Sequence, residues 1–354
     1  MPDALPDGSR RSRFWLFAPF VLLALVAVAW SVAWFVIRGR VVEQLDAALA
    51  REAAAGRQWT CTDRATSGYP FRIEVACSAL TLQRGDTRAS FGRVVSVAQV
   101  YQPRLIIAEV AGPLQVVSGD ARLDAQWRLL QMSLHLAEGG FQRASLVASD
   151  VRLRGTGVTP AEIAASAERL EAHLRPDPAR IASEGAYDVA LTLSKAAVPA
   201  LNELIGGNEP VDLSADLLVT RGRTLTGGSP IEAAERWRQA GGGLELTRVA
   251  LAKGARRLEA KGTLGLDDQH RATGRLEIAV AGLEDVVARI TGVRIGGTGS
   301  ALLGTLMGGQ KPGADRAGAA GDRKLAQLPA VRLENGRVLL GPVALPGVRL
   351  TPLY

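Results

Sequence analysis

Apolar and polar residues alternate along most of the chain after residue 57, and this period of two strongly restricts the fold. The alternating segments are short and end at Gly, Pro or Asp, which is typical of antiparallel strands with one apolar and one polar face. They cover residues 78–83, 93–100, 104–110, 114–117, 122–125, 131–136 and 144–153. The pattern predicts a mainly β fold with short helices, in which residues 57–354 form a large, mostly antiparallel curved sheet.

The clearest alternation lies in residues 241–282. Tight polar turns divide it into three predicted strands, Leu244–Ala252, Arg257–Leu266 and Arg271–Ala281. Further along, Asn335-Gly336 is a strong two-residue turn signal and predicts a hairpin within Val331–Leu340.

Helices are predicted to be few and short. Capping boxes with Pro at the first helical position occur at Thr159–Glu162 and Ser229–Glu232, so a helix should begin at each. Three more are predicted at Pro199–Ile205, Leu283–Ile290 and Ser300–Met307. Residues 308–323 lack large apolar side chains and predict a flexible loop.

The segment Phe14–Ile37 contains no charge and only one hydroxyl, Ser31. It fits the roughly 20 apolar residues that a helix needs to cross a bilayer. A cleaved secretory signal is the alternative, but that would have a shorter apolar region followed by a small-residue cleavage site. We therefore expect an uncleaved transmembrane helix, with residues 1–13 as a cytoplasmic tail and residues 38–56 as a helical stalk.

The chain has only two cysteines, Cys61 and Cys77, on either side of a turn-forming cluster at Ser67–Pro70. A hairpin centred near this cluster would place Cys61 opposite Cys77 and Arg64 opposite Glu74, which suits a cross-strand disulfide. Two free buried thiols, or half of a metal site, are the alternatives. Two sulfurs without a nearby histidine make a poor zinc site.

A disulfide persists mainly in an oxidising compartment such as the bacterial periplasm. Three arginines precede the apolar segment and two follow it, so the positive-inside rule favours a cytoplasmic N-terminus only slightly. Together these features predict a single-pass protein of the bacterial cytoplasmic membrane, with residues 57–354 in the periplasm.

The sequence gives no sign of an enzyme, a cofactor or a metal site. The phosphate-loop pattern fails at Gly304–Lys311, because Gln310 stands where lysine is required. Asp267 and Asp268 indicate a polar turn rather than an acid/base pair, since adjacent side chains on a strand point apart. The net charge of +7 comes without a basic block interleaved with aromatic residues, so nucleic-acid binding has no support.

Several segments resemble a membrane-anchored bacterial family catalogued as domain of unknown function 2125. They are the apolar helix, Trp59-Thr60-Cys61, the segment Gly68–Arg72 and the C-terminal sequence ENGRVLLGPVALPGVRLTPLY. The residues of the central family motif are Gly68, Tyr69, Pro70, Phe71 and Arg72. The resemblance implies an envelope protein with one N-terminal span and no established activity. The strands near residues 244–267 are more weakly similar to AsmA-like envelope proteins, which form long curved sheets associated with lipid handling.

An apolar surface spread over many strands is too broad to leave in water. We therefore expect a non-enzymatic, membrane-anchored protein whose apolar sheet face contacts or shelters lipid. The expected partners are the cytoplasmic membrane bilayer, phospholipid and other envelope proteins. The alternative is that short helices close the face, which leaves a scaffold or protein-interaction module without a ligand.

Overall fold

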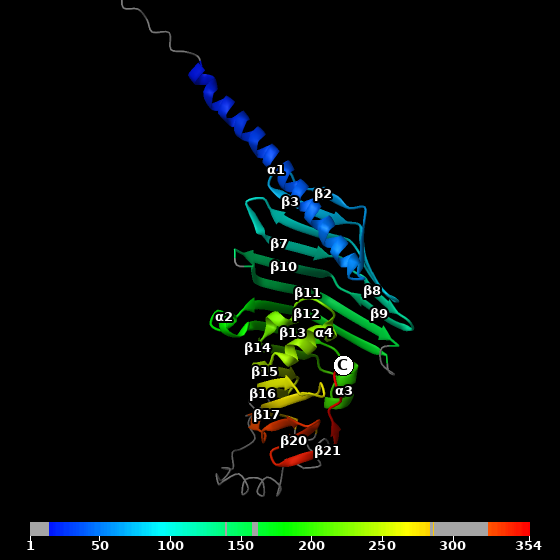
Figure 1. Ribbon diagram of the computed structural model, residues 1–354. Helices are drawn as coiled ribbons and strands as arrows, with labels where there is room; N and C mark the ends of the chain where they lie inside the picture. The colour runs from blue at the N-terminus through cyan, green and yellow to red at the C-terminus, as the bar shows by residue number, and fades with distance from the viewer. Residues whose placement is uncertain (1–13, 139, 158–161, 284–285, 287–324) are drawn as a thin grey trace, which may run out of the picture.

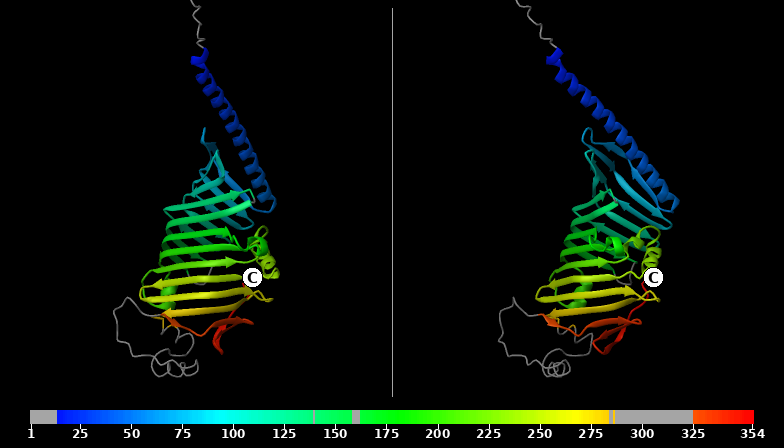
Figure 2. Two further views of the ribbon diagram at one scale, coloured as in Figure 1. Left: turned by 90° about the vertical axis from the view of Figure 1, so that its left-hand side faces the viewer. Right: turned by 60° about the vertical axis from the view of Figure 1, so that its left-hand side comes forward.

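The structure, a computed structural model, describes residues 14–138, 140–157, 162–283, 286 and 325–354. One long helix, α1 (Phe14–Ala54), leads into a tall, curved, mainly antiparallel sheet (Figure 1). Successive strands lie one below another, so that the N-terminal helix and the C-terminal strands occupy opposite ends of the molecule (Figures 1 and 2). The predicted fold class is therefore confirmed.

The described residues form 21 strands in one sheet. Their bounds are β1 Gln58–Thr62, β2 Ala65–Ser67, β3 Arg72–Cys77, β4 Ala79–Arg84, β5 Thr87–Phe91, β6 Val94–Gln99, β7 Gln102–Val110, β8 Leu114–Ser118, β9 Ala121–Gln126, β10 Leu129–Ala137, β11 Gly140–Thr156, β12 Ile163–Pro176, β13 Tyr187–Ala196, β14 Val211–Val219, β15 Leu244–Lys253, β16 Arg256–Leu266, β17 Ala272–Ala281, β18 Ala326–Gln327, β19 Val331–Glu334, β20 Arg337–Leu340 and β21 Val343–Arg349. The short helices are α2 Ile181–Glu184, α3 Pro199–Ile205, η1 Gly222–Leu225 and α4 Pro230–Gln239.

The sheet branches at its longest strand, β11. The first part of β11 pairs with β10 and the last part with β9, while β12 pairs with both parts. From β10 the sheet continues through β7, β6 and β3 to β2, which we call the first wing. From β9 it continues through β8, β5 and β4 to β1, the second wing. On the other side of β11, strands β12 to β17 form a single layer.

Most of the elements predicted from the sequence are confirmed. The three-strand meander is β15 to β17, and the hairpin at Asn335-Gly336 is β19 and β20, with φ values of 53° and 72° at the two turn residues. The helix predicted at Pro199–Ile205 is α3. The predictions at Leu283–Ile290, Ser300–Met307 and 308–323 fall almost entirely outside the described residues.

The helix predicted after Thr159–Glu162 is wrong. Residues 158–161 lie outside the described residues, and Ile163–Pro176 forms the strand β12. This strand pairs with β11 along one side and with β13 along the other. Pairing on both sides outweighs a local capping signal, which is worth only about 1 kcal/mol.

The second capping box forms as predicted. Ser229 accepts a hydrogen bond from the Glu232 backbone N–H, and the Glu232 side chain accepts one from the Ser229 backbone N–H. The middle of α4 contacts Tyr354, whose hydroxyl donates to Glu235 over 3.1 Å. Glu235 also pairs with Arg238 at 2.8 Å, and this ion pair holds the pKa of Glu235 well below its usual range.

Helix α1 is continuous through the predicted span and stalk, and its surroundings change midway. From Phe17 to Trp30 nearly all side chains are exposed around the helix. Beyond Ser31, one stripe becomes partly or fully buried, at Trp34, Ile37, Val41, Leu45 and Leu49. Their spacing of three and four residues places them on one side of the helix. Thus the first half of α1 makes little contact with the rest of the protein, while the second half packs on the sheet.

Candidate functional site

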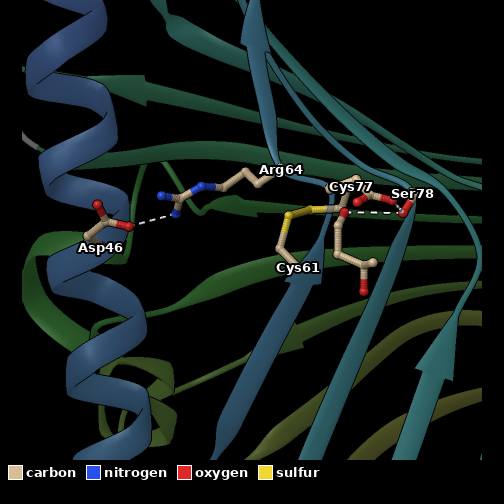
Figure 3. Close-up of a disulfide and its surroundings, with 7 residues drawn as sticks. Asp46, Cys61, Arg64, Cys77 and Ser78 are labelled. Carbon is tan, nitrogen blue, oxygen red and sulfur yellow. Dashed lines mark hydrogen bonds and ion pairs between the residues drawn. A yellow bond between two sulfur atoms is a disulfide. The ribbon is translucent and has the colours of Figure 1, made fainter.

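A disulfide joins Cys61 of β1 to Cys77 of β3, with 5.3 Å between the two Cα atoms (Figure 3). The predicted bond is therefore present, and a hairpin forms around the Ser67–Pro70 turn from β2 and β3, but the predicted placement of Cys61 opposite Cys77 is wrong. Cys61 lies opposite Leu80, and Cys77 lies opposite Val94. Because β1 belongs to the second wing and β3 to the first, the disulfide ties the two wings together at the end near α1.

The predicted pairing of Arg64 with Glu74 is also wrong. Arg64 donates to Asp46 of α1 over 2.6 Å (Figure 3), and Glu74 lies opposite Ser67. The cause is a sharp corner at Asp63, whose φ of 48° turns the chain from the second wing to the first. The segment Cys61–Cys77 thus contributes strands to both wings. Its Arg64 links the sheet to α1 through Asp46.

The family motif Gly68–Arg72 docks against α1 where its surroundings change. The Trp30 indole N–H donates to the Pro70 carbonyl over 2.9 Å, and the Trp34 indole N–H donates to the Arg72 carbonyl over 3.0 Å. The Ser31 and Tyr69 hydroxyl oxygens are 2.8 Å apart. Three polar groups of the apolar helix therefore bond to one short segment of the sheet domain.

Backbone conformation and close packing explain why residue 68 of this segment is a glycine. Gly68 has a φ of 107°, and an added Cβ would lie 2.7 Å from the Arg72 carbonyl oxygen. The Arg72 N–H donates to the Gly68 carbonyl over 3.1 Å, which closes the turn. The turn places Tyr69 against Trp34, with the two rings edge-on and their centroids 5.4 Å apart. Only 3% of Trp34 is exposed.

Cross-strand pairing reveals a continuous apolar face on one side of the sheet. Residues directly opposite each other in an antiparallel pair project to the same side. The central row, from β3 to β17, is Val75, Ser96, Ala108, Met132, Leu146, Ala172, Leu191, Ala215, Val249, Ala260 and Ile278. Ser96 is the only polar side chain in this row.

Two further rows flank the central one. The first is Ile73, Ala98, Ile106, Leu134, Ala144, Leu174, Val189, Leu217, Leu246, Gly262 and Leu276. The second is Leu130, Ala148, Leu170, Leu193, Leu213, Leu251, Leu258 and Val280. We call the three rows together the apolar face. Ten strand spacings of about 4.8 Å give it a length of about 48 Å from β3 to β17.

The middle of the apolar face is not fully covered by the described part of the chain. Met132, Leu174 and Leu191 remain 39%, 36% and 37% exposed. Smaller members are better buried, with Ala215 at 7% and Val280 at 4%. An exposed apolar surface of this extent commonly marks a site of interaction with lipid, ligand or protein.

Helix α3 lies at one margin of this face. Lys253, two residues beyond Leu251 and so on the same side of β15, is fully buried. Its ammonium donates to the Asn202 side-chain oxygen over 2.8 Å and to the Glu209 carbonyl over 2.5 Å. These bonds pin α3 over the ends of the strands, so the helix borders the face without spanning it.

The opposite side of the sheet is polar and holds a cavity of about 470 Å³, next to His173 and Arg175. The His173 Nδ1 lies 2.9 Å from the Ser145 hydroxyl, and Arg175 pairs with Asp188 at 2.9 Å. Arg169, and then His173, lower the pKa of Glu171. These groups hydrogen-bond or pair with one another, as expected for a solvated strand surface, and as the sequence indicates for His173.

The docking of α1 on the family motif was not predicted from the sequence. A signal for it exists, because Trp30, Ser31 and Trp34 fall on one side of a helix at spacings of three and four residues. Three hydrogen-bonding side chains on one side of an otherwise apolar span indicate a protein contact rather than lipid alone.

The family model described as "Uncharacterized protein conserved in bacteria (DUF2125)" matches residues 34–348, so the chain belongs to this family. The match begins at Trp34, the residue that binds the Arg72 carbonyl. No curated protein and no solved structure matches the chain. The likeness to AsmA-like proteins therefore has no support from these comparisons.

Proposed function

We propose that this member of the DUF2125 family is a non-enzymatic protein, anchored by α1 in the bacterial cytoplasmic membrane, whose apolar face binds the acyl chains of phospholipids. One observation carries the proposal. The apolar face runs without a charged side chain from β3, beside the anchor helix, to β17, and side chains along it stay exposed.

The dimensions suit acyl chains. Neighbouring rows on one side of a strand are two residues apart, or about 7 Å, so three rows make a strip about 14 Å wide. All three rows are present from β10 to β17, over seven strand spacings or about 34 Å, and a strip of this size holds several extended acyl chains side by side. Binding would remove the exposed parts of Met132, Leu174 and Leu191 from water, at about 25 cal/mol for each Å² buried.

The compartment in this proposal is the periplasm. Helix α1 is long and apolar enough to cross a membrane. The Cys61–Cys77 bond lies on the far side of this segment from residue 14 and requires an oxidising environment to persist. Other envelope proteins are proposed partners, because lipid held on an open face must be delivered or removed.

Paired substitutions on single strands test lipid binding. Met132→Glu and Leu191→Glu place carboxylates on the apolar face, at exposed positions where water can solvate them. Their controls are the exposed neighbours Gln131→Glu and Thr192→Glu, which place the same charge on the opposite side of the same strands. Each full-length variant is purified from membranes in detergent, and bound phospholipid is extracted and quantified by mass spectrometry.

We expect the variants on the apolar face to retain much less phospholipid than the wild type after detergent exchange, and the controls to retain as much. Equal retention by all four variants would contradict binding to this face. Lipid-free protein throughout would instead favour a scaffold that binds other envelope proteins. Thermal melting of each variant shows whether a loss of lipid reflects unfolding.

A further inference from the structure

We propose that exposed aromatic side chains of α1 and of the adjoining end of the first wing form a bilayer-contact surface in the interfacial layer of the membrane. The surface consists of Trp30, Phe35, Tyr69, Phe71 and Tyr101, and we call it the aromatic edge. The inference rests on the proposed membrane span of α1. It adds that the sheet domain itself touches the bilayer, and it identifies the residues that do so.

The depth of the aromatic edge follows from the length of the helix. From Phe14 to Trp34 the helix rises by about 30 Å, which matches the hydrocarbon thickness of a bilayer. Trp34 therefore reaches the far interface when Phe14 lies at the near one. The Arg72 carbonyl is 3.0 Å from the Trp34 indole nitrogen, so the family motif lies at the same depth.

Trp30 binds the Pro70 carbonyl one helical turn deeper than Trp34, about 6 Å closer to the bilayer centre. At such a depth an unpaired backbone carbonyl or indole N–H is costly. Both indole N–H groups are paired with carbonyls, and the Ser31 hydroxyl contacts Tyr69. The contact between helix and motif thus pairs polar groups that the hydrocarbon layer of the bilayer would otherwise leave without hydrogen-bond partners.

The aromatic rings of this surface are exposed and therefore available for contact with a partner. Phe35, Tyr69, Phe71 and Tyr101 are 59%, 53%, 61% and 67% exposed, and Trp30 is 36% exposed. Among the residues whose side-chain exposure the structure describes, which begin at Phe17, the other exposed aromatic side chains are Phe17 and Phe20, in the apolar first half of α1. Exposed rings are therefore confined to the span and to this one edge of a sheet about 48 Å long.

Tyr101 belongs to the edge although it is distant in sequence from the motif. The Val100 N–H donates to the Phe71 carbonyl over 2.9 Å, which places the β6–β7 turn beside the motif. Aromatic rings with a polar end prefer the membrane–water interface. Arg72 lies in the same segment and pairs with Glu74 at 3.3 Å, but its side chain stays 59% exposed, so its guanidinium can also approach an anionic headgroup.

The aromatic edge also adjoins one end of the apolar face. Ile73, which follows Arg72, is the first member of a flanking row and is 6% exposed. The first residue of this row is thus buried, directly behind the segment that carries the aromatic edge. A partner protein is the rival occupant, but it would not explain why the exposed rings lie at the depth set by the helix.

Depth-dependent fluorescence quenching tests the inference in the full-length protein. Tyr101→Cys is labelled with an environment-sensitive fluorophore, and the control is Gln269→Cys, an exposed turn residue near the other end of the sheet. Cys61 and Cys77 are bonded to each other and do not compete for the label. The protein is reconstituted into phosphatidylethanolamine–phosphatidylglycerol vesicles whose lipids carry a nitroxide near the headgroup or near the chain end.

We expect the headgroup nitroxide to quench the Tyr101→Cys label by more than half, the chain-end nitroxide to quench it less, and neither to quench the Gln269→Cys label. Quenching of the Tyr101→Cys label by an aqueous quencher alone would overturn the inference. Vesicle flotation after alkaline extraction separates this failure from failure of the anchor. Protein that floats without lipid quenching retains its span and lacks the bilayer contact, whereas protein that does not float refutes both.

Discussion

Removal of the disulfide should loosen the end of the sheet nearest to α1. In the double variant Cys61→Ser/Cys77→Ser, the covalent link between the two wings is lost. Strand β1 then depends on its pairing with β4, the one strand that it pairs with among the described residues. The sequence separation of 16 residues corresponds to a chain-entropy stabilisation of about 3 kcal/mol.

For a domain of this size, 1 kcal/mol shifts the melting temperature by about 2–4 °C, so the loss of about 3 kcal/mol should make the double variant melt roughly 6–12 °C below the oxidised wild type. Circular dichroism of purified protein measures this shift with and without reductant. Reductant should lower the melting temperature of the wild type to that of the variant. The variant itself should not respond, which makes it the matched control for other effects of the reductant.

The loss of stability in the double variant should be confined to the end of the sheet that contains the disulfide. Hydrogen exchange followed by mass spectrometry should show faster exchange in β1 to β3 of the variant, with β15 to β17 unchanged. Equal melting of variant and oxidised wild type would refute the reasoning that the disulfide stabilises the joined wings. Faster exchange throughout the sheet would show that the destabilisation is not confined to this end.

Three further predictions concern other parts of the chain. Ser229→Ala removes the cap of α4 and should cost about 1 kcal/mol in a denaturant titration; an unchanged midpoint would contradict the role of the capping box. Arg238 lowers the pKa of Glu235 below its ordinary value of 4.5, so this ion pair stabilises the fold fully above that pH and loses its contribution as the pH falls through the lowered pKa. Glu235→Gln should therefore weaken the fall in melting temperature on acidification, and parallel curves for variant and wild type would contradict this. A periplasm-active reporter fused after Tyr354 should be active, whereas activity of a cytoplasm-only reporter would overturn the proposed topology.

Sequence reasoning recovered those features that depend on neighbouring residues. The alternation of apolar and polar residues in β15 to β17, the capping box at Ser229 and the turn at Asn335-Gly336 each determine local structure directly. The apolar face follows from the same alternation, since each strand presents one apolar side. Its continuity across eleven strands also requires the registers, which only the assembled sheet provides.

The incorrect predictions concern segments whose structure depends on contacts with distant parts of the chain. Cys61 and Cys77 bond as predicted, but a corner at Asp63 sends their strands into different wings. The capping signal at Thr159–Glu162 is followed by a strand, because β11 and β13 pair on both sides of β12. The family motif was recognised as a sequence, and its contact with Trp30 and Trp34 became evident only when the helix and the turn were placed together.

With α1 spanning the bilayer as proposed, its uninterrupted course links membrane thickness to the tilt of the sheet domain. A transmembrane helix tilts when its apolar length exceeds the thickness of the surrounding bilayer. The second half of α1 is fastened to the sheet by Trp34 and by the Asp46–Arg64 ion pair, so the sheet must lean with the helix. With a lever of about 48 Å, a change in tilt of about 10° would move β17 by about 8 Å. Thinner and thicker membranes would thus hold the far end of this protein at different positions.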